Sequence, residues 1–275
     1  MVNWNKKNIK RLLFGELSLK RVLRSVFFIY PFLCFYAVFF SDRMIFQPPA
    51  ASYQDTSEII KLSSANGMKI SAVHFPNPQA QYTILYSHGN AEDLGYIWSV
   101  LQDIRDSGFA VFAYDYQGYG TSEGKPSEYN VYRDIEAAYG YLTEQLRVPP
   151  KQIILYGHSV GGGPAVDLAS RQSVGGLVVE SSFVSVFRVL TRIPLLPFDK
   201  FVNVDKIGKV RTPVLVIHGK ADQVVPFWHG EQLFAAAKQP KFNFWVDRAG
   251  HNDLMDVAGD RYATTLRSFV NAIAN

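Results

Sequence analysis

The sequence predicts an α/β domain built on a mostly parallel, eight-stranded sheet with helices on both faces and a short cap. Three observations predict this fold and the transmembrane helix that we expect before it. Short β-rich runs alternate with helix-length segments from about residue 55 to the end of the chain. The central runs are continuously apolar, as strands are when both faces of their sheet are covered. An uncharged apolar run over residues 25–41 comes before all of them.

Length, composition and charge fit one enzyme-sized domain with a short extension. The chain has 275 residues, of which 48% are apolar and 19% charged, so it can bury a large core. The net charge is +4, but residues 1–24 hold seven basic side chains and one acid, which leaves 4 − 6 = −2 for the rest. A nucleic-acid binder needs positive charge on its folded surface, so we expect no nucleic-acid partner.

The apolar run over residues 25–41 predicts an uncleaved transmembrane signal anchor. As a helix, its 17 residues span about 25 Å, near the lower limit for a hydrocarbon core of about 30 Å. A cleaved signal peptide would need small residues at its cleavage site, and Val38-Phe39-Phe40-Ser41 has none suitable. A buried soluble helix would carry more polar residues.

The charge around this run predicts its orientation. The basic residues precede it, so the positive-inside rule keeps the N-terminus cytoplasmic. The folded domain is then expected on the non-cytoplasmic side, periplasmic or extracellular in a bacterium. Within the basic segment 1–24, four apolar residues suit a helix lying on an anionic membrane surface: Ile9, Leu12, Leu13 and Leu17. Residues 42–54 are expected to form a turn-rich linker, and residues 55–275 the domain. The only cysteine, Cys34, excludes an intrachain disulfide framework.

The domain's elements follow in order along the chain. Strands are expected at 59–62, 68–75, 82–87, 109–114, 153–156, 176–179, 214–217 and 242–246. Helices are expected at 92–107, 127–146, 160–172, 227–238 and 254–273. A parallel sheet of this kind places its ligand site beyond the carboxyl ends of the strands. The residues that follow each strand are therefore the candidates for function.

The strand at 153–156 is followed by Gly157-His158-Ser159-Val160-Gly161, a G-x-S-x-G turn between a strand and a helix. A serine hydroxyl is a weak nucleophile, so it needs a base and a fixed direction of approach, which a tight turn supplies. The glycines leave room for a strained backbone and close packing. Ser159 is therefore the candidate nucleophile.

Two late strands supply a candidate acid and base. Asp222 follows the strand at 214–217 and His251 the strand at 242–246, which gives the chain order Ser, Asp, His of a hydrolytic triad. His251 would take and return the proton, and Asp222 would hold its tautomer. Glu180 is the alternative acid. We expect Asp115 to brace a loop and Asp253 to cap the last helix.

The loop His88-Gly89-Asn90-Ala91 follows the strand at 82–87. A developing oxyanion needs two preorganised backbone N–H donors, and Val160 and Asn90 are the candidates for this oxyanion hole. His88 is predicted to be a structural turn residue. The remaining histidines do not follow a late strand in a loop that could reach Ser159: His74, His158, His218 and His229.

These motifs resemble the α/β-hydrolase superfamily from about residue 55 to the end. The resemblance is greatest to its small membrane-anchored branch, which includes lysophospholipase-like esterases and protein depalmitoylases. The stretches that carry it are Ser87–Ala91, Asp115–Ser122, Gly157–Gly162, His218–Asp222 and Gly250-His251. The resemblance implies the α/β-hydrolase fold and no metal or organic cofactor. The sequence agrees, since it has no clustered His/Cys/Glu set and no phosphate-binding G-K-[ST] loop.

The predicted reaction is acyl transfer to Ser159 and hydrolysis of the acyl-enzyme by water activated through His251. We expect carboxylic esters as substrates, lipid esters above all, and a membrane as partner; the oligomeric state stays open. A peptidase-like amidase or a thioesterase would use the same triad, and a catalytically silent binding module could share the fold. The expected topology argues against palmitoylated proteins, which lie on the cytoplasmic face.

About 30 residues separate two core strands between Glu180 and Thr212, where this fold commonly inserts a cap. Two interpretations remain for this segment: a helix packed on the core, or an apolar lid that faces the membrane. Its apolar residues are Phe183, Phe187, Leu190, Ile193, Leu195, Leu196 and Phe198. Exposure of these side chains would favour the lid.

Overall fold

The computed structural model describes residues 18–274 of the chain. It contains two compact units, Met1–Met44 and Ile45–Asn275. The first holds helix α2, Leu19–Ile45, apart from its last residue. In the described part of the chain, α2 is the one helix long and apolar enough to cross a membrane, and it could anchor the protein there.

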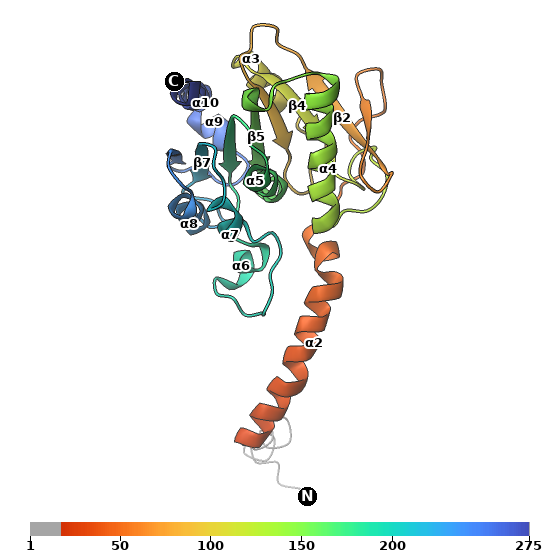
Figure 1. Cartoon of the computed structure of the whole chain (residues 1–275). Helices are drawn as coiled ribbons and strands as arrows, with labels where there is room; N and C mark the ends of the chain where they lie inside the picture. Colours follow the sequence, from red (N-terminus) through yellow and green to blue (C-terminus); the bar gives the residue numbers. More distant parts are fainter. Residues whose placement is uncertain (1–17, 275) are drawn as a thin grey trace, which may run out of the picture. The chain divides into compact units, whose positions relative to one another are not determined.

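Helix α2 extends past both ends of the predicted span at 25–41 (Figure 1). Its 27 residues reach about 40 Å at about 1.5 Å per residue. A helix formed by the apolar run continues into flanking residues that do not break it, so Leu19–Arg24 belongs to the same helix. The residues expected to lie on the membrane surface are all outside the described part: Ile9, Leu12, Leu13 and Leu17.

The second unit contains the predicted eight-stranded, mostly parallel sheet. Its strands are β1 Ile60–Ser63, β2 Lys69–Phe75, β3 Thr83–Ser87, β4 Ala110–Tyr114, β5 Ile153–His158, β6 Gly176–Glu180, β7 Val214–Gly219 and β8 Lys241–Val246. The order across the sheet is β1-β2-β4-β3-β5-β6-β7-β8. β2 runs antiparallel to β1 and β4, and the neighbours from β4 to β8 are parallel.

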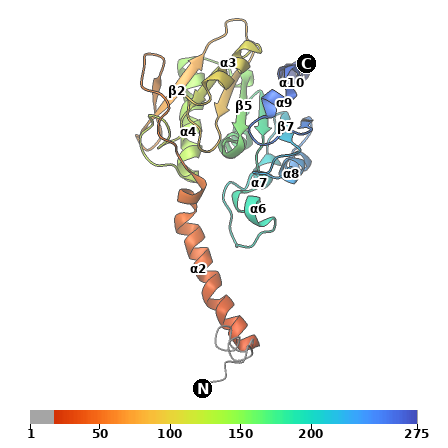
Figure 2. The ribbon, with the colours of Figure 1, turned by 180° about the vertical axis from the view of Figure 1, so that it is seen from behind.

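Helices cover both faces of this sheet (Figure 1). They are α3 Trp98–Asp106, α4 Glu128–Gly140, α5 Gly162–Arg171, α6 Val186–Thr191, α7 Asn203–Ile207, α8 Trp228–Ala236, α9 Leu254–Ala258 and α10 Asp260–Ala274. One core cluster joins α4, α5, α7 and α8 to one face, and the other joins α3, α9 and α10 to the opposite face, seen from behind in Figure 2. Strand β4 shows why both are needed. Phe112 and Tyr114 enter the first cluster and Val111 and Ala113 the second, because side chains alternate along a strand.

Two predicted helices differ from the observed ones. The segment expected at 254–273 is divided into α9 and α10 at Gly259, whose φ of +55° favours glycine. The helix expected at 92–107 begins only at Trp98. Residues before it form a loop that the Asp93 carboxylate holds, since Asp93 accepts hydrogen bonds from the N–H groups of Ser52 and Tyr96 at 2.7 and 2.9 Å.

The segment predicted as a linker, residues 42–54, is mostly exposed, but two of its side chains, Phe46 and Tyr53, are held in the catalytic unit. Helix α2 continues to Ile45, and the compact catalytic unit begins at that residue instead of at residue 55. Phe46 is only 3% exposed, within the main core cluster. The Tyr53 hydroxyl donates to Asp115 Oδ2 at 2.5 Å. An apolar side chain that can be buried and a hydroxyl that finds a carboxylate both favour packing over a free linker.

Candidate active site

The site lies where β5, β7 and β8 end. These strands are parallel to their neighbours, with His158 opposite Glu180 and Gly219 opposite Val246 in the register. Their carboxyl ends therefore lie along one edge of the sheet, and the loops that follow them meet there. Ser159 comes directly after β5, Asp222 follows β7 and His251 follows β8.

Ser159 has the strained backbone expected of a nucleophile on a tight turn. Its φ is +52°, in the left-handed region that side chains other than glycine rarely adopt. A Cβ on Gly157 would lie 2.4 Å from the Gly161 carbonyl oxygen, and one on Gly161 would lie 2.0 Å from the Ser87 oxygen. Neither distance is compatible with a side chain, so both glycines of the motif are required by packing.

The three candidate triad residues form one chain of hydrogen bonds. His251 Nε2 lies 2.9 Å from Ser159 Oγ, and His251 Nδ1 lies 2.7 Å from Asp222 Oδ2. Asp222 Oδ1 accepts the N–H groups of Val224 and Val225 at 2.9 and 2.8 Å. Burial alone would raise the pKa of Asp222, but the hydrogen bond from His251 and those from the backbone hold it below its ordinary value. An ionised Asp222 accepts a hydrogen bond from Nδ1–H, so the unprotonated Nε2 can act as a base toward Ser159.

Glu180, the alternative acid, is used elsewhere. Its Oε2 atom accepts the hydroxyl of Tyr156, and that of Tyr262 at 2.5 Å. Its Oε1 atom lies 3.9 Å from His158 Nε2. Among the described residues, no hydrogen bond or ion pair joins Glu180 to His251. The geometry therefore favours Asp222 as the acid.

An ion pair between the buried His158 and the half-buried Glu92, which the sequence analysis missed, lies beside the candidate triad. His158 Nδ1 is 3.6 Å from Glu92 Oε2, and the ring centroids of His158 and His251 are 5.5 Å apart. Burial alone would lower the pKa of His158, but the charges of Glu92 and Glu180 outweigh it and raise the pKa to about 9. Burial would raise the pKa of Glu92, but His158 lowers it to about 2. Glu92 follows no strand directly, so its position gave no signal.

The two proposed oxyanion donors lie in the loops on either side of Ser159. In the register, Ser87 of β3 is opposite Gly157 of β5, which brings the loop at 88–91 beside the turn. Val160 is in the 3₁₀ turn Ser159–Gly161 before α5, where N–H groups lack intrahelical partners. The Gly89 N–H donates to Glu92 Oε2 at 2.7 Å, whereas the structure records no acceptor for the Asn90 N–H within residues 18–274.

The expectation that His88 is a structural residue and Asp115 a loop brace agrees with their contacts. Asp115 Oδ1 accepts the Leu94 N–H at 3.0 Å and lies 3.3 Å from His88 Nε2. His88 is fully buried. Asp253 differs from the expectation. It stands before α9, but its carboxylate accepts the Gly250 N–H at 2.6 Å and makes no capping hydrogen bond, so it stabilises the loop that carries His251.

Two more residues that sequence reasoning missed or set aside support the site. The Ser182 hydroxyl donates to the Ser159 carbonyl oxygen at 2.8 Å and so holds the strained turn. His218 Nε2 is 2.9 Å from the Val225 carbonyl oxygen and 3.5 Å from Asp222 Oδ2. Burial lowers the pKa of His218, so it stays neutral beside the triad acid. The Ser182 contact joins residues 23 apart in the sequence, whereas those of His218 are made within the loop after β7.

The cap segment between Glu180 and Thr212 is packed on the core in its first part and exposed in a later part. Phe183 is buried in the core, and Phe187 and Phe198 are half-buried with ring centroids 6.2 Å apart. Leu190 is 83% exposed, and Ile193 and Leu195 are 59% and 54% exposed. The first part is therefore a packed element, and the second, from Leu190 in α6 to Leu195, presents exposed apolar side chains.

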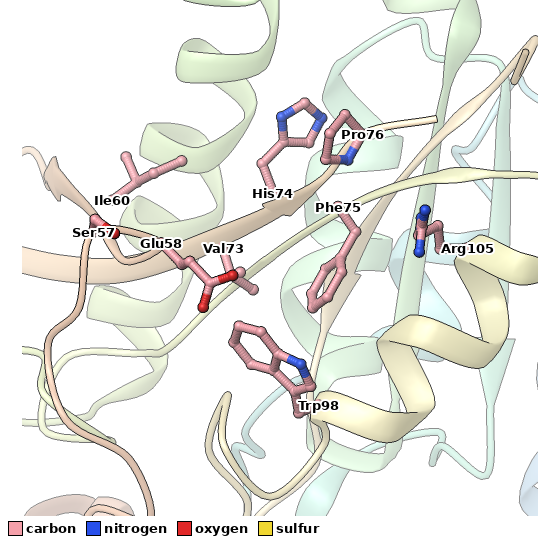
Figure 3. A pocket seen from close by; sticks show the side chains of 9 residues that line it. All are labelled: Ser57, Glu58, Ile60, Val73, His74, Phe75, Pro76, Trp98 and Arg105. Atoms are coloured by element: carbon pink, nitrogen blue, oxygen red, sulfur yellow. The ribbon is translucent and has the colours of Figure 1, made fainter. Parts of the chain in front are cut away.

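A cavity of about 390 Å³ lies away from the triad and contains none of its residues. It lies beside β2 and α3, where Phe75 packs edge-on against Trp98 with ring centroids 4.9 Å apart, near Arg105 and His74 (Figure 3). Over residues 18–274, no group of three or more His, Cys, Asp or Glu residues is arranged to hold a metal ion.

Comparisons with known proteins find α/β hydrolases. A family profile described as "Serine aminopeptidase, S33" matches residues 78–204. The human alpha/beta hydrolase domain-containing protein 17B is 40% identical over 222 residues, which cover 79% of this chain and 76% of the relative. The alpha/beta hydrolase domain-containing protein 17C of Mus musculus is 43% identical over 198 residues, 70% of this chain and 61% of the relative.

Two solved structures show the same fold at low identity. An esterase of Pyrococcus furiosus superposes with a TM-score of 0.69 and 19% identity over 82% of this chain and 98% of its own. The monoacylglycerol lipase of Paleococcus ferrophilus gives a TM-score of 0.60 and 20% identity over 75% of this chain and 100% of its own.

Proposed function

This chain belongs to the α/β-hydrolase family that includes the alpha/beta hydrolase domain-containing proteins 17, and from that premise we propose that it hydrolyses carboxylic esters through Ser159. One observation carries the proposal. Ser159, His251 and Asp222 form a hydrogen-bonded chain at 2.9 and 2.7 Å on a turn whose nucleophile has a strained backbone. Nucleophile, base and orienting acid are the elements that acyl transfer requires.

The first half of the reaction forms the acyl-enzyme. Ser159 Oγ attacks the ester carbonyl carbon while His251 Nε2 takes its proton, and Asp222 stabilises the imidazolium. The backbone N–H groups of Val160 and Asn90 bind the negative oxygen of the tetrahedral intermediate. The ester C–O bond then breaks, and His251 returns the proton to the leaving alcohol.

The second half regenerates the free enzyme. Water gives a proton to His251 and attacks the acyl carbon, and the same two N–H groups bind the new oxyanion. The bond to Ser159 Oγ breaks, His251 returns the proton to the serine, and the carboxylic acid leaves. Ser159, 9% exposed, sits in a largely dry environment, which strengthens each of these electrostatic interactions.

The exposed cap residues support lipid esters as substrates. Leu190, Ile193 and Leu195 form an apolar patch that water does not favour and that an acyl chain or a bilayer would cover. Helix α2 would hold the domain at a membrane, where lipid esters lie. The likeness to a structure named as a monoacylglycerol lipase agrees with this substrate class. The basic residues before the apolar run favour a non-cytoplasmic catalytic domain.

Amide hydrolysis is the second candidate, because the matching family profile is described as a serine aminopeptidase. The same triad could cleave an amide, with His251 protonating the leaving amine in place of an alcohol. Rates for an ester and an amide with the same acyl group separate the two candidates. We expect the ester to be the better substrate.

The test uses the full chain in detergent or lipid nanodiscs with p-nitrophenyl esters from acetate to palmitate. Wild type should hydrolyse them, with an optimum at medium or long chains, and should be labelled by a fluorophosphonate probe. Ser159→Ala should lose both hydrolysis and labelling. Full turnover in Ser159→Ala would refute the proposed nucleophile, and an unlabelled, inactive wild type would favour a binding module. A C-terminal reporter tests the orientation, since reporter signal in the cytoplasm would overturn it.

A further inference from the structure

The end of helix α2 is hydrogen-bonded to the loop that carries a proposed oxyanion donor. We call residues Ile45, Phe46 and Gln47 the junction; all three belong to the catalytic unit. Asn90 Nδ2 donates to the Ile45 carbonyl oxygen at 2.7 Å, and the Gln47 N–H donates to Asn90 Oδ1 at 3.0 Å. One side-chain amide thus bonds to the backbone of two residues of the junction.

Two further contacts hold this arrangement. The Tyr119 hydroxyl donates to Asn90 Oδ1 at 2.6 Å, so the carbonyl oxygen of that amide has two donors. Phe46 is 3% exposed and packs edge-on against Tyr119 and Phe201, with ring centroids 6.5 and 6.0 Å away. Phe201 belongs to the segment that returns from the cap. The junction is therefore fixed by two hydrogen bonds to the Asn90 amide, which Tyr119 also holds, and by the buried ring of Phe46.

Asn90 connects this arrangement to the chemistry. Its side chain bonds to the junction, while its backbone N–H is the proposed second oxyanion donor and is without a recorded acceptor in the described residues. Its neighbours restrict the loop from both sides, since the Gly89 N–H is bound by Glu92 and Ala91 has a φ of +56°. A donor contributes to catalysis only where its direction is preorganised toward the developing charge.

We propose that the junction, through the side chain of Asn90, positions the oxyanion hole. The inference rests on the proposed function, because it assigns Asn90 a role in ester hydrolysis through Ser159. Asn90, Tyr119 and Phe46 are positioning residues, since their side chains act through the backbone N–H of Asn90. Loss of the contacts that hold the junction should lower kcat and leave substrate binding nearly unchanged, because the Asn90 N–H binds the oxyanion in the transition state.

The experiment compares four variants of the full chain in nanodiscs. Asn90→Ala removes all three hydrogen bonds of the amide but keeps the backbone N–H. Phe46→Ala removes the buried ring, and Phe46→Leu keeps an apolar side chain of similar bulk. Thr212→Val is the matched control, because the Thr212 hydroxyl makes a buried hydrogen bond to the Val174 carbonyl oxygen at 2.8 Å, outside the site. Readouts are kcat and KM per titrated active site, the melting temperature, and inhibition by a trifluoromethyl ketone, which forms an oxyanion on the enzyme.

We expect Asn90→Ala to lower kcat by about 10- to 100-fold, somewhat less than the loss of a whole oxyanion donor, with KM within about twofold of wild type. Its inhibition constant for the trifluoromethyl ketone should rise by the same factor as kcat/KM falls. Phe46→Ala should change in the same direction, and Phe46→Leu should stay near wild type. Thr212→Val should lower the melting temperature without changing kcat.

Different outcomes identify which proposal fails. If Asn90→Ala keeps wild-type kcat and inhibitor affinity while Ser159→Ala is inactive, the junction has no catalytic role and the proposed function stands. If Ser159→Ala is active, the proposed function itself fails. Should Asn90→Ala not fold, Tyr119→Phe removes one of the three hydrogen bonds and should lower kcat by about two- to fivefold with KM unchanged. An unchanged kcat in that variant would also overturn the inference.

Discussion

The ion pair of His158 and Glu92 should make the domain less stable at alkaline pH than at neutral pH. His158 is buried and Glu92 is half-buried, and the ring centroids of His158 and His251 are 5.5 Å apart. The pKa of His158 is about 9 in the folded protein, compared with an ordinary value of 6.5. Because the folded-state pKa is raised, the stabilisation is complete below about pH 6.5 and is lost as the pH rises through 9.

The size of the effect follows from the two pKa values. The difference between 6.5 and about 9 corresponds to roughly 3 kcal/mol of unfolding free energy. Most of it remains at pH 7 and little at pH 9, so about 2 kcal/mol is lost between them. The same ion pair also shifts the pKa of Glu92, which adds a dependence of stability on acidic pH. Its pKa falls from 4.5 to about 2, so its contribution is present above pH 4.5 and is lost as the pH falls through 2.

The perturbation is Glu92→Gln, which removes the charge and keeps the size of the side chain. Urea unfolding of the full chain in detergent, at pH 6 to 9.5, gives the unfolding free energy of wild type and variant. Their difference should shrink by between 1 and 2 kcal/mol, order of magnitude, from pH 7 to pH 9, because Glu180 retains part of the effect on His158. Groups that titrate alike in both proteins cancel in the difference. Parallel pH profiles would refute the assigned ion pair.

Three further predictions concern the triad, its support and the cap. Asp222→Asn should fold but lower kcat by about 10³- to 10⁴-fold, since Nδ1 loses its anionic acceptor; circular dichroism and esterase assays check both. Ser182→Ala removes the hydrogen bond to the Ser159 backbone and should cost about 1 kcal/mol in unfolding free energy with a severalfold lower kcat, whereas an unchanged kcat would mean that the turn needs no such support. Leu190→Ser should reduce hydrolysis of long-chain esters and leave acetate unchanged; equal loss on both would contradict an acyl or membrane contact.

Much of the fold could be predicted because its signals are local. Continuous apolar runs bounded by turns predicted all eight strands, with ends within about two residues of those observed. The helix at 254–273 was less accurate, since a break at one glycine needs a φ value that periodicity does not report. The ends of helix α2, Leu19 and Ile45, also differ from the predicted span at 25–41, because the apolar run does not show how far the helix continues into its flanking residues.

The sequence by itself determined the candidate triad, because each member follows a strand and parallel strands end at one edge of a sheet. Only the tertiary structure decided between Asp222 and Glu180, since both follow strands and only distances to His251 separate them. The contacts of Glu92 with His158 and of the junction with Asn90 are also seen only in the tertiary structure. Such contacts join side chains distant in sequence through burial and hydrogen-bond geometry, and neither property is encoded in a local pattern of residues.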